Sequence, residues 1–71
     1  MDADAGRLSV TVKMRRRALA LSQDELAELA GTSVRFVRSL EHDKTTVRLD
    51  KLEAVLEVLG LELRAQLRDT Q

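Results

Sequence analysis

Apolar residues recur three and four positions apart through most of the chain, which is the spacing of helices that bury one face. This pattern predicts four helices, over residues 8–19, 23–30, 34–42 and 49–59. The core is expected to be aliphatic, because Phe36 is the only aromatic residue. The core-facing positions are Leu8, Val12, Leu19, Leu26, Ala27, Leu29, Ala30, Val37, Leu40, Leu49, Leu52, Val55, Leu56 and Leu59.

Residues that start and stop helices stand between these segments. Ser22 is followed three residues later by Glu25, which predicts a capping box at the start of the second helix. Ser33 is the expected cap of the third helix. Gly31 and Gly60 follow the second and fourth helices, where a residue that accepts a left-handed conformation ends a helix well.

The hydrophobic period changes to two after the fourth helix. Leu61, Leu63, Ala65 and Leu67 alternate with polar residues, which predicts a half-buried strand over residues 61–68. A fifth helix is the alternative, since two of these leucines also lie four residues apart. No other segment has the pattern of a strand, so we expect this one to pair with the same strand of a second copy across a two-fold axis.

Composition excludes several kinds of site. The chain has 71 residues and no Cys, so disulfides, thiolate zinc sites and thiol catalysis are ruled out. One His cannot build a zinc site alone, because zinc normally takes four ligands. A chain this short buries only about 60% of its unfolded surface, which favours a partner subunit as support. No nucleophile–base pair, phosphate loop or metal cluster stands out, so neither an enzyme nor a cofactor is expected.

The distribution of charge matters more than its sum. Basic and acidic residues number 12 each, which argues mildly against a nucleic-acid partner. Between Lys13 and Arg48, however, eight basic residues stand against five acidic ones. A dimer would present these cations twice and neutralise several phosphates. The acidic start and the lack of a long apolar run argue against a signal peptide and a membrane span, so a cytoplasmic location is expected.

The two short helices joined at Gly31, the second with Arg35 and Arg38 on its free face, form a helix-turn-helix pattern. The stretch from Leu21-Ser22-Gln23 through Leu26-Ala27 and Ala30-Gly31 resembles the Xre/Cro–phage repressor family, and the similarity covers about residues 8–60. Within that family, residues 36–41, 44–51 and 59–61 resemble the HipB-type antitoxins.

This resemblance implies a mainly α fold: an Xre-type helix-turn-helix domain of four to five helices, with a short C-terminal β-strand pairing across a dimer. Residues 1–7 would be a disordered N-terminus, residues 8–60 the DNA-binding domain, residues 61–68 the dimerisation strand and residues 69–71 a tail. The implied function is a sequence-specific antitoxin of the bacterial cytoplasm and nucleoid that represses its own operon and binds a HipA-type kinase toxin. A repressor without a toxin, or a protein-interaction module of the same fold, are the alternatives.

The resemblance also implies which residues contact double-stranded DNA at an inverted-repeat operator. The family's base-reading positions fall on Val34, Arg35, Arg38 and Ser39. Its phosphate-contacting positions fall on Gln23 and Ser33, with weaker matches at Arg16, His42 and Lys44. The dimerisation residues would be Leu61, Leu63, Ala65 and Leu67.

Three positions depart from the family's pattern. Arg15 stands where an apolar residue is usual, so its charge is expected to reach solvent along the alkyl stem. Ala20 and Asp43 stand at or near places where Gly is usual, and Asp43 would put an anion close to the DNA. Glu41 is expected to be an internal partner for an arginine of the first helix.

Overall fold

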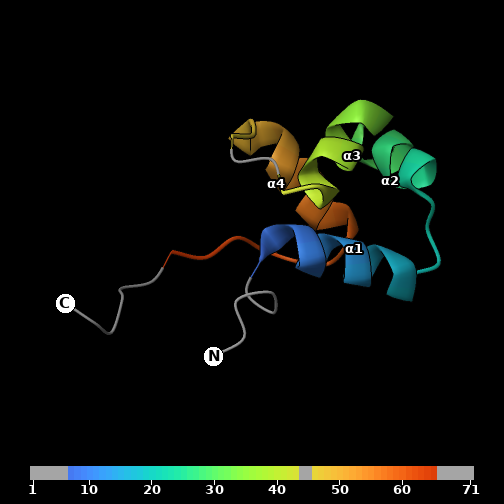
Figure 1. The fold of residues 1–71 in the computed structure, drawn as a ribbon, viewed down its shortest axis with the longest axis horizontal. Coiled ribbons are helices and arrows are strands. Elements are labelled where there is room, and N and C mark those ends of the chain that lie inside the picture. Colours follow the sequence, from blue (N-terminus) through green and yellow to red (C-terminus); the bar gives the residue numbers. More distant parts are fainter. Residues whose placement is uncertain (1–6, 44–45, 66–71) are drawn as a thin grey trace.

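The structure is a computed structural model that describes residues 7–43 and 46–65. These residues form four helices: α1 Leu8–Ala18, α2 Gln23–Ala30, α3 Val34–Glu41 and α4 Leu49–Val58 (Figure 1). The mainly helical class is therefore confirmed, and each predicted helix is present with ends that differ by one residue at most. None of the described helices is long and apolar enough to cross a membrane.

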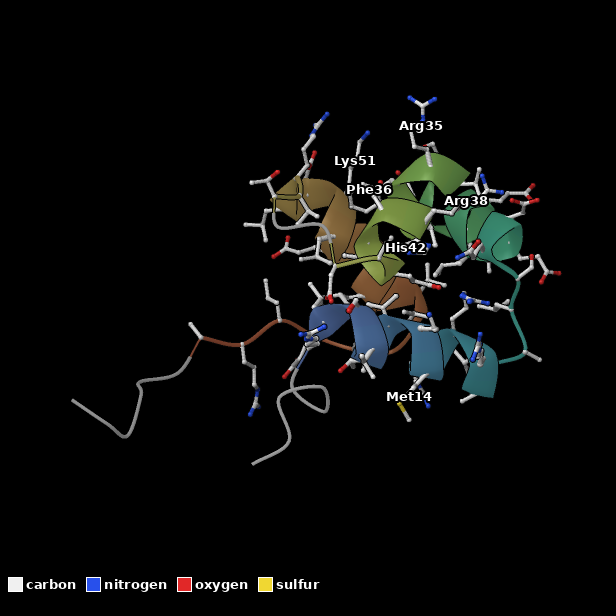
Figure 2. All side chains as sticks on the ribbon, in the orientation of Figure 1. Met14, Arg35, Phe36, Arg38, His42 and Lys51 are labelled. Carbon is white, nitrogen blue, oxygen red and sulfur yellow. The ribbon has the colours of Figure 1, made fainter. Side chains whose placement is uncertain are left out.

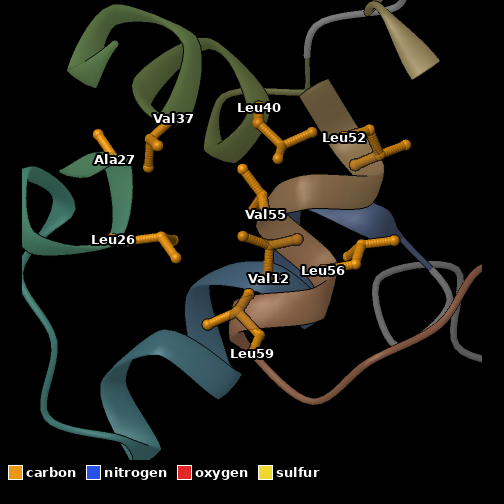
Figure 3. Packing of buried hydrophobic residues seen from close by; sticks show 9 residues of the cluster. All are labelled: Val12, Leu26, Ala27, Val37, Leu40, Leu52, Val55, Leu56 and Leu59. Atoms are coloured by element: carbon orange, nitrogen blue, oxygen red, sulfur yellow. The ribbon is translucent and has the colours of Figure 1, made fainter. Parts of the chain in front are cut away.

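The helices enclose one aliphatic core. Helix α2 packs against α3 and α4, and α1 packs against α3. The core holds side chains from every helix and from the turn after α4 (Figure 3). These side chains are Val12, Leu26, Ala27, Val37, Leu40, Leu52, Val55, Leu56 and Leu59.

Three leucines that the spacing assigned to the core are largely exposed. Leu19, Leu29 and Leu49 expose 40%, 62% and 56% of their surface. Leu19 lies beyond the last residue of α1, and Leu49 is the first residue of α4. At these ends of the helices, the helical spacing does not place the side chain in the core. Leu29 lies on α2 at the edge of its apolar face, where the neighbouring Ala30 packs against the core instead.

The predicted caps are present. The Ser22 hydroxyl accepts a hydrogen bond from the Glu25 backbone N–H at 3.0 Å, and the Glu25 carboxylate accepts one from the Ser22 backbone N–H at 2.8 Å. Ser33 accepts from the Phe36 backbone N–H at 3.1 Å. Gly31 ends α2 with a φ of 70°, in the left-handed region. The turn between α2 and α3 is therefore defined by local hydrogen bonds.

Arg15, which stands where the family usually has an apolar residue, contacts the end of α4. Its Nε donates a hydrogen bond to the Leu59 carbonyl at 2.8 Å. Carbonyls at the end of a helix lack intrahelical donors and carry partial negative charge, so a guanidinium is a suitable partner. Arg15 thereby connects the last turn of α1 to the end of α4.

The segment after α4 forms neither helix nor strand in residues 61–65. Leu61 packs against the core, whereas Leu63 exposes 50% of its surface and Ala65 is exposed. The fifth-helix alternative is not found in these residues. Leu67 lies outside the described residues, and the strand across a dimer remains a prediction.

Candidate nucleic-acid interface

Helix α3 has one face in the core and one face in solvent. Val37 and Leu40 are buried on the inner face, with 0% and 2% of their surface exposed. Arg35 and Arg38 are exposed on the other face. Figure 2 shows the Arg35 side chain directed away from the helical body, on the side opposite Met14 of α1. The two predicted base-reading arginines are therefore both accessible to a large ligand.

An ion pair connects the three helices that hold this surface. Arg16 of α1 donates to both oxygens of Glu41, the last residue of α3, with Nε–Oε2 at 2.6 Å and Nη2–Oε1 at 3.0 Å. Gln23, the first residue of α2, donates from Nε2 to Glu41 Oε1 at 3.1 Å. The Arg16 Nη1 donates to the Leu21 carbonyl at 2.8 Å. The expected internal partner of Glu41 is therefore Arg16, and this network fixes the end of α3 relative to α1 and α2.

The charges of this pair stabilise each other. Burial alone would raise the pKa of Glu41, but hydrogen bonds from Arg16 and Gln23, with the nearby charges of Arg16 and Lys13, hold that pKa below its ordinary value. The hydrogen bond to Glu41 raises the pKa of Arg16 against the opposing effect of burial. Both groups therefore stay charged at neutral pH, with the Glu41 side chain fully buried and the Arg16 side chain 11% exposed.

The structure places the other predicted contact residues in different environments. Val34 and Ser39 are half-buried on α3, while Ser33 and His42 are exposed at its two ends. Gln23 is half-buried with its amide directed to Glu41. Arg16 is buried and its guanidinium is engaged inside the protein, so the surface open to DNA does not include it. Lys44 lies outside the described residues.

A groove of about 300 Å³ lies between α3 and the start of α4. Arg35 and Ser39 line it, together with three residues that were not predicted as contact residues: Phe36, Arg48 and Lys51. The Lys51 Nζ lies 5.9 Å from the centre of the Phe36 ring, within range of a cation–π interaction. The sequence signal for Lys51 is its place outside the apolar stripe of the fourth helix, and the structure shows that this position faces the groove beside α3.

Two carboxylates near this surface have partners of their own. Asp43 follows α3 and contacts the start of α1, where its carboxylate accepts hydrogen bonds from Arg7 at 2.6 Å and from the Ser9 hydroxyl. Asp50 accepts from Arg48 at 2.8 Å, and this bond, with one from the Lys51 backbone N–H, lowers its pKa. Both anions are thus partly compensated by an arginine.

The described residues contain no group of three or more potential ligands that could hold a metal ion.

Comparison with known proteins agrees with this geometry. Residues 12–66 match the family described as "Helix-turn-helix", so the chain belongs to the helix-turn-helix proteins of the Xre type. An uncharacterized HTH-type transcriptional regulator, y4mF of Sinorhizobium fredii, is 41% identical over 61 residues, which cover 86% of this chain and 76% of the relative. Family and relative together support DNA-binding transcription regulation as the general function.

Proposed function

We propose that the protein is a sequence-specific transcriptional repressor that binds an inverted-repeat operator as a homodimer. The observation that carries this proposal is the pair of exposed arginines on α3, Arg35 and Arg38, on a helix whose opposite face is fixed in the core. Helix α3 is the second helix of the helix-turn-helix, and a helix held in this way fits the major groove of DNA. A dimer then reads two half-sites that lie about one turn of the DNA helix apart, or a multiple of it.

The side chains divide into two kinds of contact. Arg35 and Arg38 offer two-pronged hydrogen bonds to guanine, and Val34 suits a thymine methyl group, with Ser39 as a further base contact. Phosphate contacts come from Ser33, Gln23, His42 and Lys44, together with the backbone N–H groups that begin α2 and α3. Lys51, beside Arg35 in the groove, adds a cation for the phosphates that flank the half-site.

The finer proposal is that the repressor is an antitoxin. It represses its own operon in the bacterial cytoplasm, at the nucleoid, and binds a HipA-type kinase toxin encoded beside it. The support is the resemblance of residues 36–41, 44–51 and 59–61 to HipB-type antitoxins. Pull-down of the untagged partner from the native host tests this point. Recovery of a kinase encoded by the neighbouring gene supports the antitoxin, and its absence favours a repressor without a toxin.

The repressor proposal is tested by measuring how tightly the protein binds the DNA upstream of its own gene. We expect Arg35→Ala and Arg38→Ala each to weaken specific binding by about 1–3 kcal/mol and to relax the base preference at one position. The matched control is Arg17→Ala, an exposed arginine that follows Met14 by one helical turn on α1, on the side opposite Arg35 (Figure 2). Fluorescence anisotropy on operator and random duplexes measures both effects. An equal loss on the two duplexes would contradict base reading.

A further inference from the structure

Helices α3 and α4 are separated by a groove at the start of α4. Helix α2 packs closely against both of them, whereas within the described ranges α3 and α4 are not a closely packed pair. The groove between them has a volume of about 300 Å³, and Phe36 of α3 and Lys51 of α4 are among the residues that line it. A contact between these two side chains therefore joins the helices across the groove.

The ammonium group of Lys51 lies over the face of the Phe36 ring. Its nitrogen is 5.9 Å from the centre of the ring (Figure 2). The face of an aromatic ring is electron-rich and attracts a cation placed above it. In the described parts of the chain, no carboxylate forms an ion pair with Lys51. Phe36 is half-buried and packs against the core, so the ring is the fixed partner and orients the lysine.

We propose that Phe36 is a positioning residue for DNA binding, because its ring holds the Lys51 ammonium beside the reading face of α3. The inference rests on the proposed function, in which Lys51 contacts a phosphate that flanks the half-site. A lysine side chain loses rotamer freedom when an interface fixes it, and this loss lowers the affinity. A ring that orients the ammonium before DNA arrives removes part of this loss. It also keeps Lys51 near Arg35, which lines the same groove, so that a phosphate contact and a base contact are presented together.

Substitutions of Phe36 distinguish a ring that holds a cation from a side chain that only fills space. Leucine keeps an apolar side chain at this position but has no ring face, whereas tyrosine keeps the face. We expect Phe36→Leu to weaken DNA binding about two- to fivefold per half-site, since the gain from orientation is limited by the strength of a cation–π contact at an exposed site. Phe36→Tyr should bind as tightly as the wild type, within about a factor of two.

A double-mutant cycle shows whether Phe36 acts through Lys51. In a chain that carries Lys51→Gln, Phe36→Leu should cause no further loss of DNA affinity, because the cation that the ring holds is already absent. The matched control is Arg48→Gln, which removes a cation that lines the same groove but pairs with Asp50 at 2.8 Å. The losses from Phe36→Leu and Arg48→Gln should add. Fluorescence anisotropy measures the affinities, and circular dichroism verifies that each variant is folded.

Nuclear magnetic resonance of the free protein tests the ring–cation contact without DNA. Protons above an aromatic ring are shielded by its ring current, so the ε-methylene protons of Lys51 should be shifted upfield. The shift should vanish in Phe36→Leu and persist in Phe36→Tyr. An upfield shift together with coupling in the cycle supports the proposal, whereas ordinary shifts for Lys51, or equal losses of affinity in the two Phe36 variants, overturn it.

The variants also separate this inference from the proposed function. If Lys51→Gln weakens DNA binding and Phe36→Leu does not, Phe36 is no positioning residue, while the phosphate contact of Lys51 stands. If Lys51→Gln leaves the affinity unchanged, both of these roles are overturned, and base reading by α3 is still judged through Arg35 and Arg38. A chain that binds no DNA overturns the proposed function and this inference together.

Discussion

Among the described residues, two that are not glycine hold a left-handed backbone conformation, Ala20 with a φ of 59° and Asp43 with a φ of 61°. This conformation costs an L-residue with a Cβ roughly 1–2 kcal/mol. Asp43 is compensated, because its carboxylate binds Arg7 and Ser9. Ala20 is exposed and has only a methyl group, which offers no such bond. The strain at Ala20 is therefore not offset by its own side chain.

We expect Ala20→Gly to raise the free energy of unfolding by about 0.5–1 kcal/mol. The gain is the relieved strain, less the roughly 0.4–1 kcal/mol that glycine adds to the entropy of the unfolded chain. Ala18→Gly, at the last position of α1, is the control and should destabilise, because glycine is a poor helix former. Urea unfolding measures both changes. A loss of stability in Ala20→Gly would show that the turn does not store this strain.

Replacing one member of the buried Arg16–Glu41 pair should change the stability differently from replacing both. Removing Glu41 alone leaves a buried guanidinium unpaired, so Glu41→Gln should cost about 3–5 kcal/mol of stability. Replacing both groups by apolar residues, as in Arg16→Met/Glu41→Leu, should leave the stability near that of the wild type, since no charge then has to be buried. Chemical denaturation of the two variants and the wild type checks this order. A double variant as unstable as Glu41→Gln would contradict it.

The same pair predicts a dependence of stability on pH. The pKa of Glu41 is lower in the folded chain than its ordinary value of 4.5, so the unfolded chain binds the proton more tightly. The contribution of Glu41 is therefore complete above about pH 4.5 and is lost as the pH falls through the folded pKa. Unfolding measured from pH 6 down to pH 3 should show a smaller acid-induced loss in Arg16→Met/Glu41→Leu than in the wild type.

At the level of single residues, the sequence could predict roles that depend on local spacing and not roles that depend on packing. The caps Ser22 and Ser33 follow from their distance to the next residues of the chain, and the structure confirms them. Four cations lie close together in the first helix, so spacing alone could not tell that Arg16 pairs with Glu41 while Arg15 binds the end of α4. That choice depends on where α3 and α4 end in space.

At the level of elements, the helices were predictable because each carries its own apolar face, and because α2, α3 and α4 also have a start or stop signal in the sequence. The segment after α4 differs, because period-two alternation predicts a strand and a strand needs a partner for its backbone groups. Within the described ranges, residues 61–65 are paired with no other strand. The strand over residues 61–68 therefore stays a prediction, because the pairing that it requires involves a second copy of the chain.

Ser33 allows the capping of α3 to be separated from its contact with DNA. Ser33→Asp should keep the stability within about 0.5 kcal/mol, since Asp caps a helix as well as Ser and favours its positive end. The added negative charge should nevertheless weaken DNA binding, because Ser33 is one of the proposed phosphate contacts. Ser33→Ala should lose about 1 kcal/mol of stability. Thermal unfolding and fluorescence anisotropy measure the two properties, and unchanged DNA affinity in Ser33→Asp would place the start of α3 away from the backbone.

At the level of the whole molecule, the charge is balanced but not evenly distributed. The net charge is zero, so long-range attraction to DNA is weak. Arg35, Arg48 and Lys51 line the groove beside α3, whereas Glu53, Glu57 and Glu62 line a second groove on the other flank of α4. In the proposed complex, DNA affinity therefore has to come from cations that touch phosphates directly, and the proposed dimer supplies each of them twice.

The salt dependence of DNA binding tests whether cations of both subunits of the proposed dimer contact phosphates directly. Each phosphate that a protein neutralises adds about 0.9 to the magnitude of the slope of log K against log salt. Lys51→Gln removes one proposed phosphate contact per subunit, so a dimer on an inverted repeat should lose about 2 in slope, against about 1 for a single subunit on one half-site. The loss should be the same on operator and random DNA, because phosphates carry no sequence information. Arg17→Ala, on the side opposite Arg35, should leave the slope unchanged, and an equal reduction by both variants would mean that binding responds to total charge and not to the surface beside α3.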